Sequence, residues 1–166
     1  MVSPDPYGLI QSKAMISPER SLRLSLNVSE SRETALGRSV SSYSGAGVHH
    51  MAFTTDDILR TVEALKRLGA PLLPVPANYY DDLSARLGLE EALLADLQRL
   101  GLLYDRDEQG EFLHTYTDAF EGRFFFEAVQ RRGYQGFGVV NAAVRMASQA
   151  KRRMNAGTRP QTVESA

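Results

Sequence analysis

Residues 48–69 read VHHMAFTTDDILRTVEALKRLG, and this stretch predicts the most definite local structure in the chain. Its first six residues favour a strand, and Thr54 and Asp57 follow at the spacing of a helical capping box. Apolar residues then recur at helical spacing, namely Ile58, Leu59, Val62, Leu65 and Leu68. Gly69 stands where a C-terminal cap belongs, and Pro71 forbids continuation of the helix. The stretch therefore predicts a strand followed directly by a helix.

Downstream of this pair, the sequence predicts a helical insert and then three strands. Residues 71–76 contain three prolines and favour a loop, whereas 80–87 and 89–100 favour two short helices divided by Gly88. The period then changes to two, which predicts a hairpin from 102–105 and 111–117, a third strand over 123–129, and a closing helix over 141–151. This order predicts an α+β domain with a mixed or antiparallel sheet and helices on one face.

The N-terminal region predicts a hairpin with no obvious partner. Residues 7–15 and 22–26 favour two strands around a turn, and two strands alone are marginally stable. Residues 28–47 are polar and predict a connection with about one helical turn. We therefore expect three parts, namely residues 1–44 as a hairpin with its polar connection, 45–150 as the main module, and 151–166 as a flexible tail.

Composition excludes several classes of function. The 166 residues carry 19 basic and 20 acidic side chains, so charge gives no argument for binding nucleic acid or an anionic membrane. No apolar run approaches the roughly 18 residues of a membrane-spanning helix, and the N-terminus lacks the features of a signal peptide. The chain has no cysteine, which excludes disulfides and thiolate metal sites. We expect a cytoplasmic protein whose metal chemistry, if present, uses nitrogen and oxygen ligands.

Four side chains on predicted strands are candidates for chemistry: His49, His50, His114 and Glu127. Successive strand residues face opposite sides, so only one of His49 and His50 can point into a given site, and both can equally be ordinary strand residues. His114 fits either a hydrogen-bonded core residue or a ligand. Imidazole and carboxylate together suit iron or, in competition, zinc.

Glu127 interrupts an otherwise apolar strand, where an ionised carboxylate needs a partner. Two interpretations stay open at this point. In one, Glu127 pairs with Arg131 or Arg132 at the strand end, and in the other a cation holds it inward.

Several segments together resemble the 4-hydroxyphenylpyruvate dioxygenase family of the vicinal oxygen chelate superfamily. They are Gly47–Ile58, Phe125–Arg131 and Gly136–Gly138, and the resemblance runs from about Tyr7 to Ser148. It implies a β-α-β-β-β module that binds Fe(II) or another divalent metal, with His50 as the second histidine ligand and Glu127 as the carboxylate. It also implies a substrate pocket for a 2-oxo acid or related carboxylate, lined by Ser12, Asn27, His114 and Phe137.

The chain also departs from this family. The family's first histidine ligand lies upstream, yet no histidine precedes His49 here. We therefore expect a C-terminal half that is inactive alone, whose hairpin is left from a missing N-terminal module or pairs with a partner chain. An unpaired hairpin also favours homo-oligomers. Moreover, His49 and His114 stand where the family has glutamines, and residues 141–147 lack the family's phenylalanines.

Four further segments resemble a particular branch of this family. Residues 27–31, 76–83, 103–107 and 141–145 are similar to the dioxygenase-like C-terminal portion of bacterial two-domain 3-dehydroshikimate dehydratases. The main hypothesis is a fragment of an iron-dependent oxygenase of aromatic amino acid catabolism. The alternative is an accessory domain of a dehydratase of quinate and shikimate catabolism, which binds a metal or ligand and is not an oxygenase.

Overall fold

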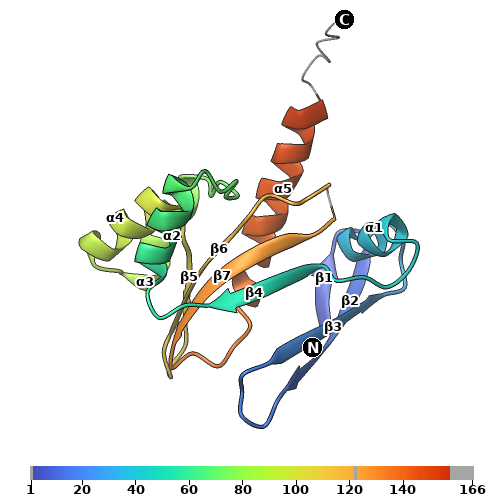
Figure 1. Ribbon diagram of the computed structural model, residues 1–166, viewed down its shortest axis with the longest axis horizontal. Helices are drawn as coiled ribbons and strands as arrows, with labels where there is room; N and C mark the ends of the chain where they lie inside the picture. Colours follow the sequence, from blue (N-terminus) through green and yellow to red (C-terminus); the bar gives the residue numbers. More distant parts are fainter. Residues whose placement is uncertain (1, 122, 158–166) are drawn as a thin grey trace, which may run out of the picture. The chain divides into compact units, whose positions relative to one another are not determined.

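The computed structural model describes residues 2–121 and 123–157, and the chain divides into two compact units. The first unit holds the residues up to His49 together with Glu121–Arg123, and the second holds the remainder. Figure 1 shows the elements of each unit, which are described in turn below. No helix in the described ranges is long and apolar enough to cross a membrane.

The first unit is a three-stranded antiparallel sheet with one helix. Its elements are β1 (Val2–Asp5), β2 (Gly8–Ile16), β3 (Arg23–Ser29) and α1 (Ala35–Ser42). The strand order β1-β2-β3 contains the predicted hairpin as β2 and β3. The sequence did not predict β1 because it contains Pro4, which cannot donate to a ladder and is tolerated only at an edge such as this one.

Helix α1 corrects the prediction of a polar connection with about one helical turn. It runs for 8 residues, and its N-terminus is capped by the buried Thr34, whose Oγ1 accepts from the Gly37 N–H at 2.9 Å. Gly37 is required there because a Cβ atom would lie 2.2 Å from the Ser31 carbonyl oxygen. The serine-rich composition concealed this helix, since serine favours caps and turns over helix interiors.

The second unit contains the predicted β-α-β-β-β module. Its elements are β4 (His50–Thr54), α2 (Ile58–Arg67), α3 (Asn78–Leu87), α4 (Glu91–Leu100), β5 (Leu103–Arg106), β6 (Glu111–Tyr116), β7 (Phe125–Arg132), η1 (Val139–Asn141) and α5 (Ala142–Gly157). The sheet order is β4-β7-β6-β5, with β4 parallel to β7 and the other neighbours antiparallel. The prediction of an α+β fold with a mixed sheet is confirmed.

Two helix ends differ from the prediction. Asp57, not Thr54, caps α2, because its Oδ1 accepts from the Arg60 N–H at 3.0 Å. Helix α5 continues to Gly157, past Lys151 where the sequence predicted a tail. The remaining tail, 158–166, lies outside the described residues.

Helices cover both faces of this sheet, which corrects the prediction of helices on one face. On one face, the Ile58 N–H at the start of α2 donates to Gln130 Oε1 of β7 at 3.2 Å. On the other, the Arg145 guanidinium of α5 lies 5.4 Å from the Phe125 ring and 5.8 Å from the Tyr116 ring. Figure 1 accordingly shows α2, α3 and α4 as one group and α5 apart from them. Sequence periodicity identified the helices, but it carries no information on which side of the sheet a helix packs.

The core includes Tyr80, whose hydroxyl has no hydrogen-bond partner among the described residues. The residue is 2 % exposed, so this hydroxyl is removed from water without compensation. Replacing Tyr80 with phenylalanine should raise the free energy of unfolding by about 1–2 kcal/mol, measured by urea denaturation. Its neighbour Tyr79, whose hydroxyl is hydrogen-bonded to Tyr104, is the matched control, and Tyr79→Phe should lower stability. Equal losses in both variants would contradict this prediction.

Candidate functional site

The parallel pairing of β4 and β7 brings His50 beside Glu127. The register places Ala52 opposite Glu127 and His50 opposite Phe125. The side chains of His50 and Glu127 therefore project from the same face of the sheet. His50 Nε2 lies 3.5 Å from Glu127 Oε2, and the His50 ring stacks on the Phe125 ring with 5.0 Å between centroids. The stacking fixes the imidazole with its outer nitrogen towards the carboxylate.

The other oxygen of Glu127 is held by His114 on β6. His114 Nδ1 lies 2.8 Å from Glu127 Oε1, and His114 is fully buried, with its ring stacked on Phe112 at 4.4 Å. Of the two earlier interpretations, the one in which an arginine pairs with Glu127 is not what the structure shows. Arg132 pairs with Glu111 at 3.7 Å, and the Arg131 guanidinium lies 4.3 Å from the Phe112 ring. Two histidines therefore hold the carboxylate inward.

Asn141, the last residue of η1 and directly before α5, extends this network, and no sequence pattern predicted its role. It is 1 % exposed, and its Nδ2 lies 3.0 Å from His114 Nε2 and 3.1 Å from the Tyr104 carbonyl oxygen. Its Oδ1 lies 3.2 Å from the Tyr79 hydroxyl. Asn141 stands in a short 3-10 turn, where residue spacing has no period that could have revealed a contact with a strand.

The histidines also set the charge of the site. Burial alone would raise the pKa of Glu127, but hydrogen bonds with His114 and then His50 outweigh it and lower the pKa from 4.5 to about 2. Burial, followed by the charge of Glu127, raises the pKa of Tyr116 above its usual range. The site therefore combines an ionised carboxylate with a neutral phenol.

The lowered pKa of Glu127 predicts how stability depends on pH. A carboxyl group whose pKa is lower in the folded state stabilises the protein above its unfolded pKa. That contribution should be lost as the pH falls from about 4.5 towards about 2. Urea denaturation at each pH should show this loss in wild type and in Glu91→Gln, an exposed control on α4, but not in Glu127→Gln. Parallel profiles for wild type and Glu127→Gln would contradict it.

The pair formed by His50 and Glu127 fits two ligands of a divalent cation. Two donor atoms each about 2.1 Å from a tetrahedral zinc-like ion lie about 3.4 Å apart, close to the 3.5 Å found here. No group of three His, Cys, Asp or Glu in the described ranges forms a complete site, and His114 directs Nδ1 at Glu127. The second unit thus presents one imidazole and one carboxylate oxygen.

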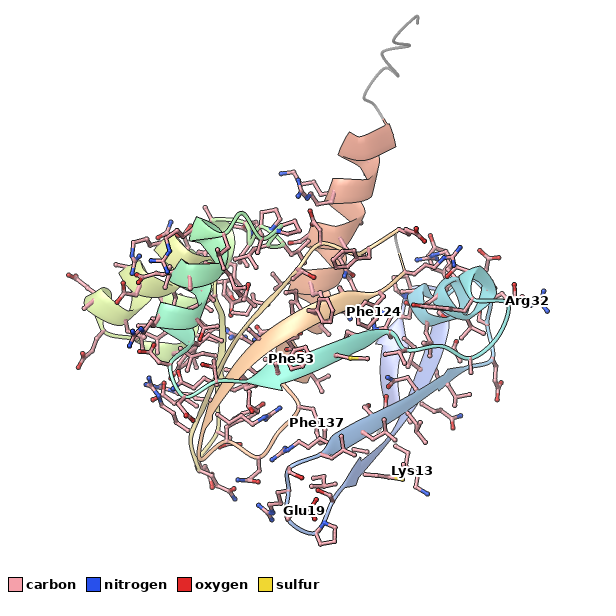
Figure 2. The ribbon with its side chains drawn as sticks, in the orientation of Figure 1. Lys13, Glu19, Arg32, Phe53, Phe124 and Phe137 are labelled. Carbon is pink, nitrogen blue, oxygen red and sulfur yellow. The ribbon has the colours of Figure 1, made fainter. Side chains whose placement is uncertain are left out.

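The remaining candidates lie in three other places along the described chain. In the first unit, the Ser12 hydroxyl donates to Asn27 Oδ1 at 2.6 Å, across the register that pairs β2 with β3. His49 directly precedes β4. Figure 2 shows Phe137 in the loop that follows β7, and Phe53 projecting from β4. The substrate roles of Ser12, Asn27 and Phe137 stay predictions.

Comparison with known proteins agrees with this architecture. The family described as the glyoxalase/bleomycin resistance protein/dioxygenase superfamily matches residues 3–96, more than half of the chain. The chain belongs to this superfamily. Its mixed sheet and β-α-β-β-β order are those of the superfamily's module, as the resemblance implied.

Relatives of this superfamily member include two proteins named 3-dehydroshikimate dehydratase. The protein of Pseudomonas putida is 52% identical over 96% of this chain, and that of Pseudomonas aeruginosa is 52% identical over 92%. A 4-hydroxyphenylpyruvate dioxygenase of Pseudomonas aeruginosa is 36% identical over 78%. The chain spans 26% and 24% of the two dehydratases and 37% of the dioxygenase.

Two solved structures have a fold similar to that of this chain. A fusion of a xylose isomerase-like TIM barrel with a 4-hydroxyphenylpyruvate dioxygenase matches 86% of this superfamily member at 53% identity, with a TM-score of 0.75. The match covers 23% of the fusion protein. A mutant of 4-hydroxymandelate synthase from Streptomyces coelicolor is 26% identical over 93% of the chain, with a TM-score of 0.74. The chain is thus more similar to the two dehydratases, at 52% identity, than to the dioxygenase, at 36% identity.

Proposed function

We propose that this chain is the dioxygenase-like part of a 3-dehydroshikimate dehydratase, and that it binds a divalent cation through His50 and Glu127 without being an oxygenase by itself. The geometry that supports this most is the pair itself, two ligand atoms 3.5 Å apart with the carboxylate held from behind by His114. The branch is supported by the likeness to two dehydratases along nearly the whole chain. In this proposal the dehydration belongs to a barrel such as that of the fusion protein.

The residues of the pair have distinct tasks in this proposal. Fe(II), or another divalent metal, would act as a Lewis acid for a 2-oxo acid or related carboxylate. His50 offers Nε2 as a ligand on the partly exposed side, since its side chain is 34% exposed. Glu127 offers Oε2, and at 8% side-chain exposure its negative charge favours a cation in that position. Ser12, Asn27 and Phe137 are the proposed contacts with the substrate.

The proposal includes a partner that supplies a further ligand, because a metal held by only two protein ligands exchanges readily with the solvent. The missing ligand would come from an N-terminal module or a partner chain, including a second copy of this chain. Among the described strands, β4 lies at the end of the sheet order, and it exposes 47% of Met51 and 59% of Phe53. An edge strand with exposed apolar side chains is a favourable surface for such a contact.

A second candidate function is the C-terminal half of a 4-hydroxyphenylpyruvate dioxygenase. It is favoured by the presence of both His50 and Glu127 at the positions that the resemblance assigns to ligands. The dehydratase proposal is preferred because His114 and Asn141 bind each other and so occupy part of the position where that family would place a substrate contact.

Oxygen uptake distinguishes the two candidates. The purified chain with Fe(II) and 4-hydroxyphenylpyruvate should consume no oxygen above a control without protein, whereas a 4-hydroxyphenylpyruvate dioxygenase assayed alongside should. When the chain is joined to the barrel portion of a dehydratase, the joined protein should still convert 3-dehydroshikimate. Uptake by the chain that depends on both substrate and Glu127 would refute the accessory role and establish the oxygenase.

A further inference from the structure

The Tyr104 backbone carbonyl determines the orientation of the Asn141 amide. A carbonyl oxygen can only accept hydrogen bonds, and the amide atom that faces it lies 3.1 Å away. That atom must therefore be the Nδ2 donor, because Oδ1 in its place would bring two acceptors together without a proton. The opposite side is consistent with this orientation, since the Tyr79 hydroxyl accepts from the Tyr104 N–H at 2.8 Å and can direct its one proton to Oδ1, which lies 3.2 Å away.

The orientation of Asn141 in turn determines which nitrogen of His114 carries the proton. The same Nδ2 lies 3.0 Å from His114 Nε2, and two donors cannot form a hydrogen bond with each other. Nε2 must therefore be the acceptor. The ring proton is then on Nδ1, which lies 2.8 Å from Glu127 Oε1 and donates to it. Asn141, His114 and Glu127, which form this chain of hydrogen bonds, are all buried, so water does not compete for these bonds.

We propose that His114 is a positioning residue, held in the Nδ1–H tautomer by Asn141, that fixes Glu127 through Oε1 and leaves Oε2 for the cation. This assignment replaces a substrate contact, because both ring nitrogens already have partners and the ring is fully buried. Only the binding of a cation at Oε2 rests on the proposed function, whereas the tautomer of His114 does not. A hydrogen-bonded residue behind a ligand commonly changes metal affinity by tenfold to a hundredfold.

The tautomer is measured first, in the metal-free wild-type protein. Nitrogen-15 spectra of the imidazole rings separate protonated from unprotonated nitrogens, and His114 is assigned by comparison with His114→Asn. The expected result is a protonated Nδ1 and an unprotonated Nε2. In Asn141→Asp, a carboxylate replaces the Nδ2 donor, and Nε2 should become protonated. An Nε2–H tautomer in wild type would overturn the proposal.

Cobalt(II) titration then tests positioning with two amide variants. The amide nitrogen of asparagine stands where Nδ1 stands in histidine, whereas that of glutamine reaches the place of Nε2. His114→Asn should therefore keep Co(II) affinity within a few-fold of wild type, while His114→Gln and His114→Leu should lose about tenfold or more. Equal losses in all three variants, with retained helical circular dichroism, would overturn positioning.

The two measurements separate this inference from the proposed function. If wild type binds no Co(II), the cation site is refuted, but the tautomer in the metal-free protein still decides whether Asn141 and His114 hold Glu127 as described. If wild type binds Co(II) and His114 has the Nε2–H tautomer, the cation site stands and the positioning role fails.

Discussion

Replacing His114 with leucine should lower the free energy of unfolding by about 3–5 kcal/mol. The substitution removes the principal partner of Glu127 and leaves a carboxylate that is only 8% exposed with a weaker neighbour, His50 at 3.5 Å. An uncompensated buried charge is more costly than the loss of the hydrogen bond itself. Urea denaturation followed by circular dichroism measures the change.

A second substitution shows whether this loss comes from the charge. In the double variant His114→Leu with Glu127→Leu, both partners are apolar, and the protein should be more stable than with His114→Leu alone. Glu111 and Arg132, which also join β6 to β7 but at 3.7 Å and with 31% and 52% side-chain exposure, provide the control cycle. Their coupling should stay below about 1 kcal/mol. A double variant less stable than His114→Leu would contradict the account.

Replacing His50 with alanine should reduce affinity for Co(II) or Fe(II) by more than tenfold while lowering the urea midpoint less than His114→Leu does. His50 would be a metal ligand, but it is partly exposed and contributes less to holding Glu127 than His114 does. Glu127→Ala should lose metal binding and stability together. Equilibrium dialysis under anaerobic conditions, with metal content determined by elemental analysis, gives the affinities.

The adjacent histidine is the matched control for this series. His49→Ala removes the same side chain one residue earlier, outside β4, and should bind metal as wild type does. If His49→Ala and His50→Ala lose affinity equally, the strand parity that assigns the ligand to His50 is wrong. If neither variant changes affinity, the proposed pair does not bind the metal.

The sequence predicted those elements whose residues repeat with a clear period. Helix α2 and strands β5, β6 and β7 follow from apolar spacing, and the structure places them within a few residues of the predicted ranges. Strand β1 and helix α1 escaped prediction because proline and serine are unfavourable in these elements, and their edge position and the Thr34 cap compensate. Tertiary context, which local pattern does not contain, stabilises both.

The site was only partly predictable for a related reason. Pattern placed His50, His114 and Glu127 on strands, but their proximity depends on the register that pairs Ala52 with Glu127 and Tyr116 with Glu127. A shift of one residue would turn each side chain to the other face. The contribution of Asn141 depends on how the chain turns back over the sheet after β7, and no local spacing encodes that return.

X-ray absorption at the cobalt edge of the Co(II)-loaded chain, kept monomeric, tests the central claim most directly. We expect a single imidazole and a carboxylate, from His50 and Glu127, with water completing the coordination of the ion. His114 should be absent from the shell because its Nδ1 is engaged by Glu127 and its Nε2 by Asn141. A shell with no imidazole, or with two or more, would contradict the account.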